Sequence, residues 1–482
     1  MKKQTFIISS VVSVGAVIAI AVSLIKPPVD EIISPYLNET IIPLDEEPNS
    51  RALLQTSIFE NATITDLVAM PDGGFIRVGQ VLTERNIYVP AIYRSDFGGG
   101  GIWYTVLNPV NIDGIDYVPQ GTSFNTIQQI IYVNPSLIYV IGTMQAKLLD
   151  SEGESYPLSG FFGSANVPIG DDTLVFVVSF TDTFTNVVLH GFLTPADEEG
   201  LQNTIVRHAT LTDANTLVLT GVTNSHAGLF ATAPNKPVFD FVMSVEVNQE
   251  LTLNHLFSFN HATYAQPSNL YALADGDIIV SGQVQEVNGD FADIPISQDV
   301  LAVGFIARLD GETFTLEWVA SNLKPGSDYP AVTQFLNVME LTNHHLITLA
   351  NVWLDAESED QEVVVLQISE TGKILKQKSL TLTGGELVAT KLLKAQTGYW
   401  LAGSLLSDTD TNIVLIKLNA NLAVEFSLAF LGSGEELWIA EPFLRNNGSF
   451  LLPIHTTSKD QDFIQFASFE QESIQLFISL SA

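Results

Sequence analysis

The sequence repeats a pattern of turns and strands about every 60 residues, and this repeat restricts the possible folds more than any other feature. In each copy a turn precedes an apolar run that ends in a small residue, as Phe75–Gly79 follows the turn Pro71–Gly74. A near-continuous apolar run is typical of a strand that is covered on both faces. Later runs of this kind lie at residues 138–142, 217–221, 278–282, 346–350, 399–403 and 450–454, the last of them degenerate.

Further strand-like segments flank the apolar run of each copy. Thr65–Met70 precedes the first run, a third strand such as Ile306–Asp310 follows a run, and a fourth strand such as Leu316–Ala320 closes the copy. Turns such as Asp310-Gly311 indicate hairpins. The sequence therefore predicts an all-β fold, a seven-bladed β-propeller of four-stranded blades over residues 51–482. A pair of β-sandwich domains is the alternative.

Composition supports a packed β-structure without covalent staples. Hydrophobic residues make up 46% of the chain and charged residues only 15%, which is typical of a globular body. The chain contains no cysteine, so disulfides, thiolate metal sites and a cysteine nucleophile are excluded. Stability must come from packing and from closure of the ring.

The charge balance is strongly acidic, with 54 acidic against 20 basic residues and a formal net charge of −34. Such a body repels polyphosphate, so we expect no nucleic-acid partner. It also repels an anionic membrane surface, whereas divalent cations and basic partners are favoured. A simpler interpretation is that the acidic surface keeps the protein soluble.

The N-terminus reads as a membrane anchor. Lys2 and Lys3 precede an uncharged segment, residues 4–25, whose apolar part Phe6–Ile25 is long enough as a helix to cross a bilayer core of about 30 Å. The positive end stays in the cytoplasm, which predicts a single-pass protein of the plasma membrane with its main body outside. Cleavage of a signal peptide near Ala19–Ala21 is the alternative, and would give a secreted protein.

The segment between the anchor and the repeats is rich in proline and acidic residues. We assign residues 1–26 to the anchor and predict an extended extracellular stalk over residues 27–50, because proline removes backbone donors and like charges repel. The strand-like segment Leu53–Phe59 lies just before the first copy. It is predicted to add a fifth strand to the last blade and so to join the two ends of the ring.

Two copies carry the family resemblance most clearly. The cadence DGGFIRVG … IYRSD..G..W of the first copy and GYWLAGSLLSDTDTNIVLIKLN of the sixth resemble the degenerate β-propeller repeats of exported or membrane-anchored bacterial proteins. The resemblance covers about residues 52–482. It implies a propeller and a role in binding or at the cell surface, and it implies no catalytic residue.

Unequal loops mark one face as the candidate binding surface. In a propeller of this order the loops between second and third strands share a face with the connections between blades. The second copy has a long insertion at about Thr143–Asp172, and the third and fourth copies have intermediate loops. Their acidic and aromatic residues suit a basic peptide, a sugar or a cation. Alternatively, these residues are exposed to solvent and have no binding role. The candidate ligand-binding residues are Asp150, Glu152, Glu154, Tyr156, Phe161, Phe162, Asp290, Asp293 and Asp299.

One hairpin tip begins like a calcium loop, and calcium is the one cofactor that the sequence suggests. Asp408, Asp410 and Asn412 have the alternating oxygen spacing with which such loops start. The glycine at position six and the acid at position twelve are missing, since Ile413 and Asn419 stand there. A charged, solvated turn explains the same residues.

Catalytic motifs are absent from the sequence: there is no His-Glu-x-x-His, no Gly-x-Ser-x-Gly and no phosphate-binding loop.

The leading hypothesis is a membrane-anchored, externally displayed propeller that binds a protein or a glycan. An exported hydrolase with carboxylates gathered in the axial channel is the second, and a structural surface protein the third. Titratable groups with shifted pKa values converging in one pocket would favour an enzyme, and an exposed apolar patch would favour a binding module.

Overall fold

The structure is a computed structural model of the 482-residue chain. It describes residues 5–6, 22–23, 39–42, 50–52, 62–72, 74–82, 88–96, 101–107, 110–112, 115–119, 126–149, 155–156, 172–194, 204–213, 215–226, 228–231, 236–248, 251–260, 265–285, 288–294, 302–321, 332–353, 361–382, 385–395, 397–406, 411–431, 436–439, 443–444, 450–458, 461–470 and 473–478. Within these ranges the regular elements are strands, apart from two short 3-10 turns, Gly228–Phe230 (η1) and Gly289–Phe291 (η2).

The described strands form seven sheets of four to seven strands, numbered here in chain order, and one isolated pair. Sheet 1 contains β5 (Ala62–Ala69), β6 (Phe75–Leu82), β7 (Tyr88–Ser95) and β8 (Gly101–Val106). Sheet 2 contains β9 (Val110–Ile112), β10 (Ile115–Pro119), β11 (Thr126–Asn134), β12 (Leu137–Leu149), β13 (Ser155–Tyr156), β14 (Asp172–Phe180) and β15 (Val188–Thr194). Sheet 3 contains β16 (Thr204–Leu211), β17 (Thr216–Thr223), β18 (Phe239–Val247) and β19 (Leu251–Phe257).

The remaining sheets complete the series. Sheet 4 contains β20 (Ala265–Ala272), β21 (Ile278–Val284), β22 (Val303–Leu309) and β23 (Leu316–Ala320). Sheet 5 contains β24 (Val332–Glu340), β25 (Leu346–Trp353), β26 (Gln361–Ile368), β27 (Ile374–Leu382) and β3 (Glu39–Ile42). Sheet 6 contains β28 (Glu386–Lys394), β29 (Tyr399–Leu406), β30 (Thr411–Leu418) and β31 (Val424–Leu431). Sheet 7 contains β32 (Glu436–Ile439), β33 (Phe443–Leu444), β34 (Phe450–Ser458), β35 (Gln461–Glu470), β36 (Ser473–Ile478) and β4 (Ser50–Ala52).

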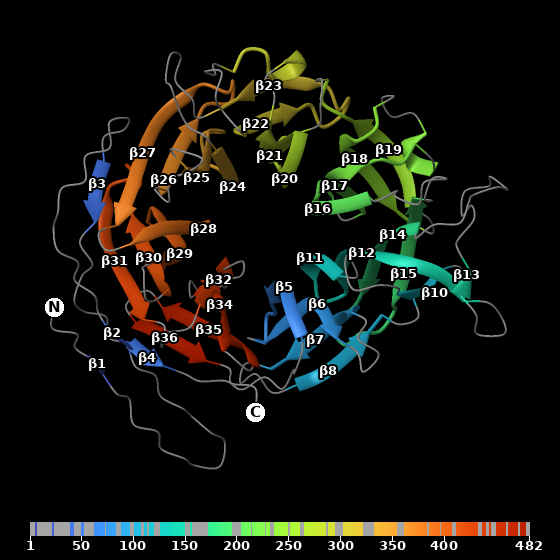
Figure 1. The fold of residues 1–482 in the computed structure, drawn as a ribbon, viewed down its shortest axis with the longest axis horizontal. Helices are drawn as coiled ribbons and strands as arrows, with labels where there is room; N and C mark the ends of the chain where they lie inside the picture. Colours follow the sequence, from blue (N-terminus) through green and yellow to red (C-terminus); the bar gives the residue numbers. More distant parts are fainter. Residues whose placement is uncertain are drawn as a thin grey trace, which may run out of the picture.

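The sheets lie around a common axis in a β-propeller-like ring (Figure 1). Strands β5, β11, β16, β20, β24, β28 and β32 face the centre, and the last antiparallel strand of each sheet lies at the periphery. Buried apolar side chains fill the spaces between successive sheets from sheet 1 to sheet 6. The core is therefore divided into layers between neighbouring sheets, as stacking of repeats requires, and the sandwich alternative is wrong.

The predicted strands of the repeat are confirmed. The seven apolar runs lie in β6, β12, β17, β21, β25, β29 and β34, each of which pairs with the innermost strand of its sheet. The glycines that end the runs in β12, β17, β21 and β29 meet the main chain of the innermost strand at close range. A Cβ on Gly221 would lie 1.9 Å from the carbonyl oxygen of Ile205, and one on Gly403 would lie 2.4 Å from that of Val388. Only glycine fits such an approach without a shift of the innermost strand.

The N-terminal strands pair with outer edges of the ring. β4 lies parallel to β36, with Ser50 opposite Ile474, so a chain segment from before the first copy adds an edge strand to the last sheet. This pairing is of the predicted kind, although the predicted segment Leu53–Phe59 itself lies outside the described residues. β3, which falls within the predicted stalk, pairs in parallel with β27.

The predicted membrane span is described at four residues only. Thr5–Phe6 (β1) pairs in antiparallel fashion with Val22–Ser23 (β2). Among the described residues, no helix is long and apolar enough to cross a membrane. The predicted transmembrane helix is thus not confirmed, and membrane attachment stays a prediction.

Sheet 2 differs from the predicted four-stranded copy. The segment predicted as an insertion at about Thr143–Asp172 begins as a continuation of β12, which runs to Leu149 and pairs with β10 and β13. An alternation of apolar and polar residues extends past Gly142 as Thr143-Met144-Gln145-Ala146, which suits a strand as well as a loop. Sheet 2 therefore has seven strands, because the extension of β12 also pairs with β10 and β13.

Two tryptophans connect the outer parts of neighbouring sheets. Trp103 on β8 donates its indole N–H to the carbonyl of Asp182 in sheet 2, at 3.0 Å. Trp318 on β23 donates in the same way to the carbonyl of Glu370 in sheet 5, at 2.9 Å. Each tryptophan lies opposite an arginine of the third strand, Arg94 and Arg308 respectively. The repeat thus places the same bridge in two different sheets.

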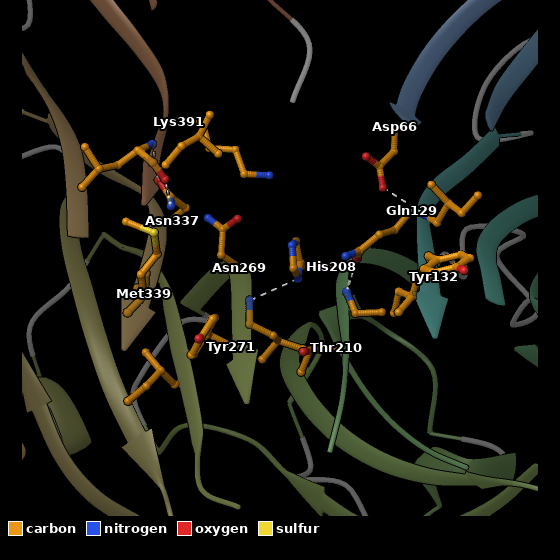
Figure 2. A pocket seen from close by; sticks show the side chains of 18 of the residues that line it. Asp66, Gln129, Tyr132, His208, Thr210, Asn269, Tyr271, Asn337, Met339 and Lys391 are labelled. Carbon is orange, nitrogen blue, oxygen red and sulfur yellow. Dashed lines mark hydrogen bonds between the residues drawn. The ribbon is translucent and has the colours of Figure 1, made fainter. Parts of the chain in front are cut away.

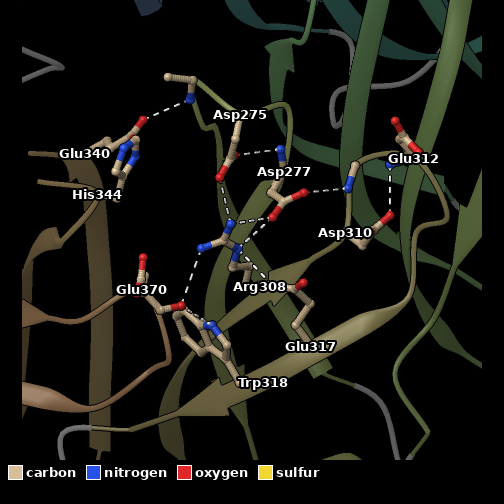
Figure 3. Close-up of polar contacts among 12 residues, drawn as sticks. Asp275, Asp277, Arg308, Asp310, Glu312, Glu317, Trp318, Glu340, His344 and Glu370 are labelled. Carbon is tan, nitrogen blue, oxygen red and sulfur yellow. Dashed lines mark hydrogen bonds and ion pairs between the residues drawn. The ribbon is translucent and has the colours of Figure 1, made fainter. Parts of the chain in front are cut away.

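The arginine beside each tryptophan holds the turn between the first and second strands of its sheet. Figure 3 shows Arg308 between the carboxylates of Asp275, Asp277 and Glu317, at 2.5 to 2.9 Å. Burial alone would lower the pKa of Arg308, but its hydrogen bond and charge interactions with these carboxylates raise that pKa above its usual value. In sheet 1, Arg94 and Asp72 make the equivalent ion pair. The turn motif seen in the sequence is therefore structural.

Candidate functional site: the axial cavity

Each innermost strand of sheets 1 to 6 carries a β-bulge near its middle. In β28 the pairing with β29 shifts between Ala389 and Lys391, and the other five strands shift at corresponding places. A bulge adds one residue to a strand and turns a side chain in a new direction. A polar residue occupies the same position of every bulge, and we call these the axial residues: Asp66, Gln129, His208, Asn269, Asn337 and Lys391.

Four axial residues accept a hydrogen bond from the main chain of the next sheet. Each donor is the N–H of the residue that directly follows the next axial residue, so the same bridge recurs around the ring. The bonds join Asp66 to Ile130 at 2.9 Å, Gln129 to Ala209 at 2.5 Å, His208 to Leu270 at 3.3 Å and Asn337 to Leu392 at 2.9 Å. Figure 2 shows them as dashed lines around one opening.

This arrangement satisfies an edge that the fold leaves open. An innermost strand has a partner on one side only, so alternate N–H and C=O groups point to the axis. Asn337 binds both groups of Leu392, since its Oδ1 accepts from the N–H and its Nδ2 donates to the C=O, each at 2.9 Å. Asn351 holds Ala389 of the same strand in the same manner. The amides thus brace β28 against sheet 5.

The innermost strands enclose a cavity of about 410 Å³ on the axis (Figure 2). Its lining comes from β5, β11, β16, β20, β24 and β28, with Ile279 of β21, and includes all six axial residues. Tyr132, Thr210 and Tyr271 add two rings and three hydroxyls to it. The volume falls within the range of small-molecule sites, and the lining combines polar side chains with aromatic rings.

The protonation of two lining groups follows from their surroundings. Burial raises the pKa of Tyr132, and the negative charges of Asp182 and Asp72 raise it further, so the phenol remains a hydrogen-bond donor. His208 accepts through Nδ1, which assigns the proton of the neutral ring to Nε2. Among the described lining residues the cavity has one carboxylate, that of Asp66.

Three of the nine predicted ligand-binding residues lie in the described part of the chain, so the predicted binding surface stays a prediction. Asp290 lies in η2, where its carboxylate accepts from the N–H of Asn260 at 2.7 Å and its own N–H donates to the Asn260 carbonyl, and Asp293 is exposed nearby. Tyr156 ends β13 in sheet 2. The remaining members lie outside the described residues: Asp150, Glu152, Glu154, Phe161, Phe162 and Asp299.

The predicted calcium loop is described at one residue. Asn412 belongs to β30, where it pairs with Leu405 and Leu431, while Asp408 and Asp410 lie outside the described residues. Within the part of the chain that the structure describes, no group of three or more His, Asp or Glu side chains could hold a metal ion. Calcium binding at this tip stays a prediction.

The axial residues were missed in the sequence because a single polar residue in a strand is common. The signal that could have found them is positional. In most first strands a polar pair interrupts the apolar alternation, as in Thr65-Asp66, Gln128-Gln129, Arg207-His208, Ser268-Asn269 and Thr390-Lys391. Such a pair at one place in consecutive repeats indicates a bulge.

Comparisons with known proteins give weak likenesses only. No protein-family model and no curated protein matches the sequence. Among solved structures, the PL25 polysaccharide lyase titled ulvan lyase has a TM-score of 0.47 at 9% identity, over 87% of this chain and 97% of that one. A mutant apocarotenoid oxygenase of Synechocystis has a TM-score of 0.39 at 9% identity, over 86% and 91%. Both scores are below 0.5, so the description of this fold rests on its own strands.

Proposed function

We propose that this chain is a seven-bladed β-propeller that binds the end of a glycan in its axial cavity. The observation that carries the proposal is the cavity itself, about 410 Å³ in volume and lined by the axial residues with two tyrosines. This volume falls within the roughly 300–1,000 Å³ of ligand sites and admits no folded protein. Amide and hydroxyl groups suit the hydroxyls of a sugar, and tyrosine rings suit its apolar face.

The distribution of exposed apolar side chains favours the axial cavity over the outer surface as the ligand-binding site. Among the described residues, the exposed large apolar side chains come from several sheets: Ile102 and Tyr104 lie on β8, Val187 and Val188 at the start of β15, Leu375 on β27 and Leu406 at the end of β29. A protein ligand on the loop face of sheets 2 to 4 is the second candidate. It is supported by the length of those loops and by the exposed Asp293.

The location of the protein is part of the proposal. The leading lysines and the apolar segment of residues 4–25 support a single-pass anchor, with the propeller displayed outside the cell. Protease treatment of intact cells that make the full chain tests it. In untreated cells we expect the protein in the membrane fraction. In protease-treated intact cells we expect the propeller to be digested, and complete protection of the propeller would contradict the proposed location.

Occlusion of the cavity tests the proposed site. The full chain is applied to immobilised oligosaccharides, and the bound fraction is compared with that of Asn269→Trp, whose larger side chain fills the axial opening. Asn421→Trp in the exposed β30–β31 turn is the matched control. We expect at least a tenfold loss of glycan binding for the first variant and none for the second. Glycan binding that is unaffected by Asn269→Trp, or capture of peptides alone, would contradict the site.

The same experiment distinguishes binding from hydrolysis. Glycoside hydrolysis ordinarily needs two carboxyl groups on either side of the scissile bond. If the retained sugar is recovered intact after prolonged incubation, the binding function is supported. Release of shorter products that stops in Asn269→Trp would identify an exported hydrolase in its place.

A further inference from the structure

The axial cavity has two tiers of side chains. Residues two places apart on a strand point to the same side, so the residue two places after an axial residue also turns toward the axis. Figure 2 shows Thr210, Tyr271 and Met339 below the axial residues. We call the residues at these places that line the cavity the second tier: Ile131, Thr210, Tyr271, Met339 and Leu393. The axial tier is polar, whereas three of the five side chains of the second tier carry neither a hydroxyl nor an amide.

Two apolar members of the second tier lie on neighbouring sheets. Met339 comes from β24 in sheet 5 and Leu393 from β28 in sheet 6, and both line the cavity. Leu393 is 8% exposed and Met339 is half-buried. A methionine side chain is unbranched and adapts to the group that it contacts. This side of the cavity therefore suits a small apolar group such as a methyl.

Two axial amides each turn one polar group to the opening. Oε1 of Gln129 accepts the N–H of Ala209 at 2.5 Å, whereas its Nε2 donates to none of the described residues. Nδ2 of Asn269 donates to Oγ of Ser268 at 3.2 Å and to the carbonyl of Phe335 at 3.3 Å, whereas its Oδ1 accepts from none of the described residues. The contacts between sheets thus leave a donor at Gln129 and an acceptor at Asn269.

These two groups lie across the cavity from each other. Figure 2 shows the amides of Gln129 and Asn269 on either side of His208, whose sheet lies between theirs. A donor on one side and an acceptor on the other match a trans secondary amide, because its C=O and its N–H point in opposite directions. A sugar hydroxyl acts as donor or acceptor on either side, so it makes no use of this asymmetry. An acetamido group also ends in a methyl, which suits the second tier.

We propose that the axial cavity selects a sugar that carries an N-acetyl group. The acetamido carbonyl accepts from Nε2 of Gln129, its N–H donates to Oδ1 of Asn269, and its methyl group lies against Met339 and Leu393. This inference rests on the proposed function, since it names the class of sugar for the same cavity.

Matched pairs of sugars test the acetamido group. Chitotriose is compared with cellotriose, and the methyl glycoside of N-acetylgalactosamine with that of galactose, since the members of each pair differ only at C2. Binding to the full chain is measured by calorimetry. In at least one pair we expect the acetamido sugar to bind about tenfold more tightly. Equal affinities within both pairs, or binding of other oligosaccharides while both acetamido sugars fail, would overturn the inference and leave the cavity as a glycan site. Failure of every oligosaccharide to bind would instead contradict the proposed function.

A variant and a modified sugar test the two hydrogen bonds. Gln129→Glu keeps an acceptor for the N–H of Ala209 and removes the donor, so we expect about a tenfold loss in affinity for the acetamido sugar and no loss for its hydroxyl partner. Asn421→Asp, in the exposed β30–β31 turn, adds the same charge and is the control. An N-methylated acetamido sugar lacks the N–H for Asn269 and should bind as weakly as the hydroxyl sugar. Thermal unfolding shows whether each variant is folded. An unchanged preference for the acetamido sugar in a folded Gln129→Glu, or full affinity for the N-methylated sugar, would overturn the proposed contacts.

Discussion

The inner and outer parts of this ring connect neighbouring sheets by different means. Near the axis, short polar side chains accept main-chain N–H groups, as Asn337 does from Leu392. At the periphery, the long side chain of Trp318 reaches the carbonyl of Glu370. Sheets that radiate from an axis are close together at the centre and separate outward, as Figure 1 shows. The distance from the axis thus determines how long a side chain must be to bridge two neighbouring sheets. Sheets 1 to 5 use short side chains near the axis, and two sheets use a tryptophan at the periphery.

The inner bridges also have a second consequence. The side chains that make them line the cavity, so bracing and ligand contact compete for the same positions. Four axial residues brace the ring by accepting a main-chain N–H, and Asn269 donates through Nδ2 to the carbonyl of Phe335 in the next sheet. Lys391 carries no acceptor, so it cannot accept a main-chain N–H as those four residues do.

The largest effect is expected from Asn337→Ala. The change leaves the N–H and C=O of the buried Leu392 without their partner, and unsatisfied buried groups cost about 1–3 kcal/mol each, reduced here where cavity water reaches them. We expect a loss of about 2 kcal/mol in the free energy of unfolding, measured by urea denaturation. Asn421→Ala, in an exposed turn, is the control. A loss below that of the control would show that the inner amides do not brace the ring.

A smaller loss is expected from Arg308→Met at the periphery. Arg308 is 13% exposed and contacts three carboxylates, and its removal leaves Asp277 without that cation. Partial exposure reduces the penalty, so we expect about 1–1.5 kcal/mol, and less at high salt. Lys373→Met, on the exposed β26–β27 turn, serves as the matched cation. A salt-independent loss would assign the effect to packing and not to charge.

Trp318→Phe removes the outer bridge alone. The phenyl ring keeps most of the apolar contact, and the lost hydrogen bond to the Glu370 carbonyl is worth about 1 kcal/mol. Trp103→Phe removes the equivalent bridge between sheets 1 and 2 and should cost a similar amount. The two variants test the internal equivalence of the repeat. Losses that differ by more than about 1 kcal/mol would break it.

The smallest effect on stability is expected from Lys391→Met. Because an ammonium group has no acceptor, replacing Lys391 by an unbranched apolar side chain leaves no main-chain N–H without its acceptor, and we expect the free energy of unfolding to change by less than about 0.5 kcal/mol. Urea denaturation beside Asn337→Ala measures it. A loss as large as that of Asn337→Ala would place Lys391 with the bracing residues.

The sequence predicted the repeated strands because their signals are local. Apolar runs that end in Gly221 or Gly403 report strands buried on two faces, and a turn such as Asp310-Gly311 reports the hairpin that follows. The extended β12 was not predicted, because the segment after Gly142 reads equally well as a loop. Its pairing with β10 depends on a chain segment about 30 residues away in sequence, which no local pattern records.

The candidate site was not predicted for a related reason. Asp66 and Lys391 are 325 positions apart in the sequence and meet at one cavity only because six sheets converge on the axis. The sequence analysis favoured loops, where Asp290 proves to hold η2 to the preceding connection. The prediction of a ring contained the information that innermost strands meet, but not which of their residues a bulge would turn inward.

Hydrogen–deuterium exchange of the full chain, followed by mass spectrometry with residue-level fragmentation, tests the inner bridges most directly. The amides of Ile130, Ala209, Leu270 and Leu392 are aimed at the axis and not at a neighbouring strand of their own sheet. We predict that all four are protected in the unmodified chain, and that Asn337→Ala exposes Leu392 while the other three keep their protection. Fast exchange of these amides in the unmodified chain, or uniform loss of protection in the variant, would contradict a ring braced by its axial residues.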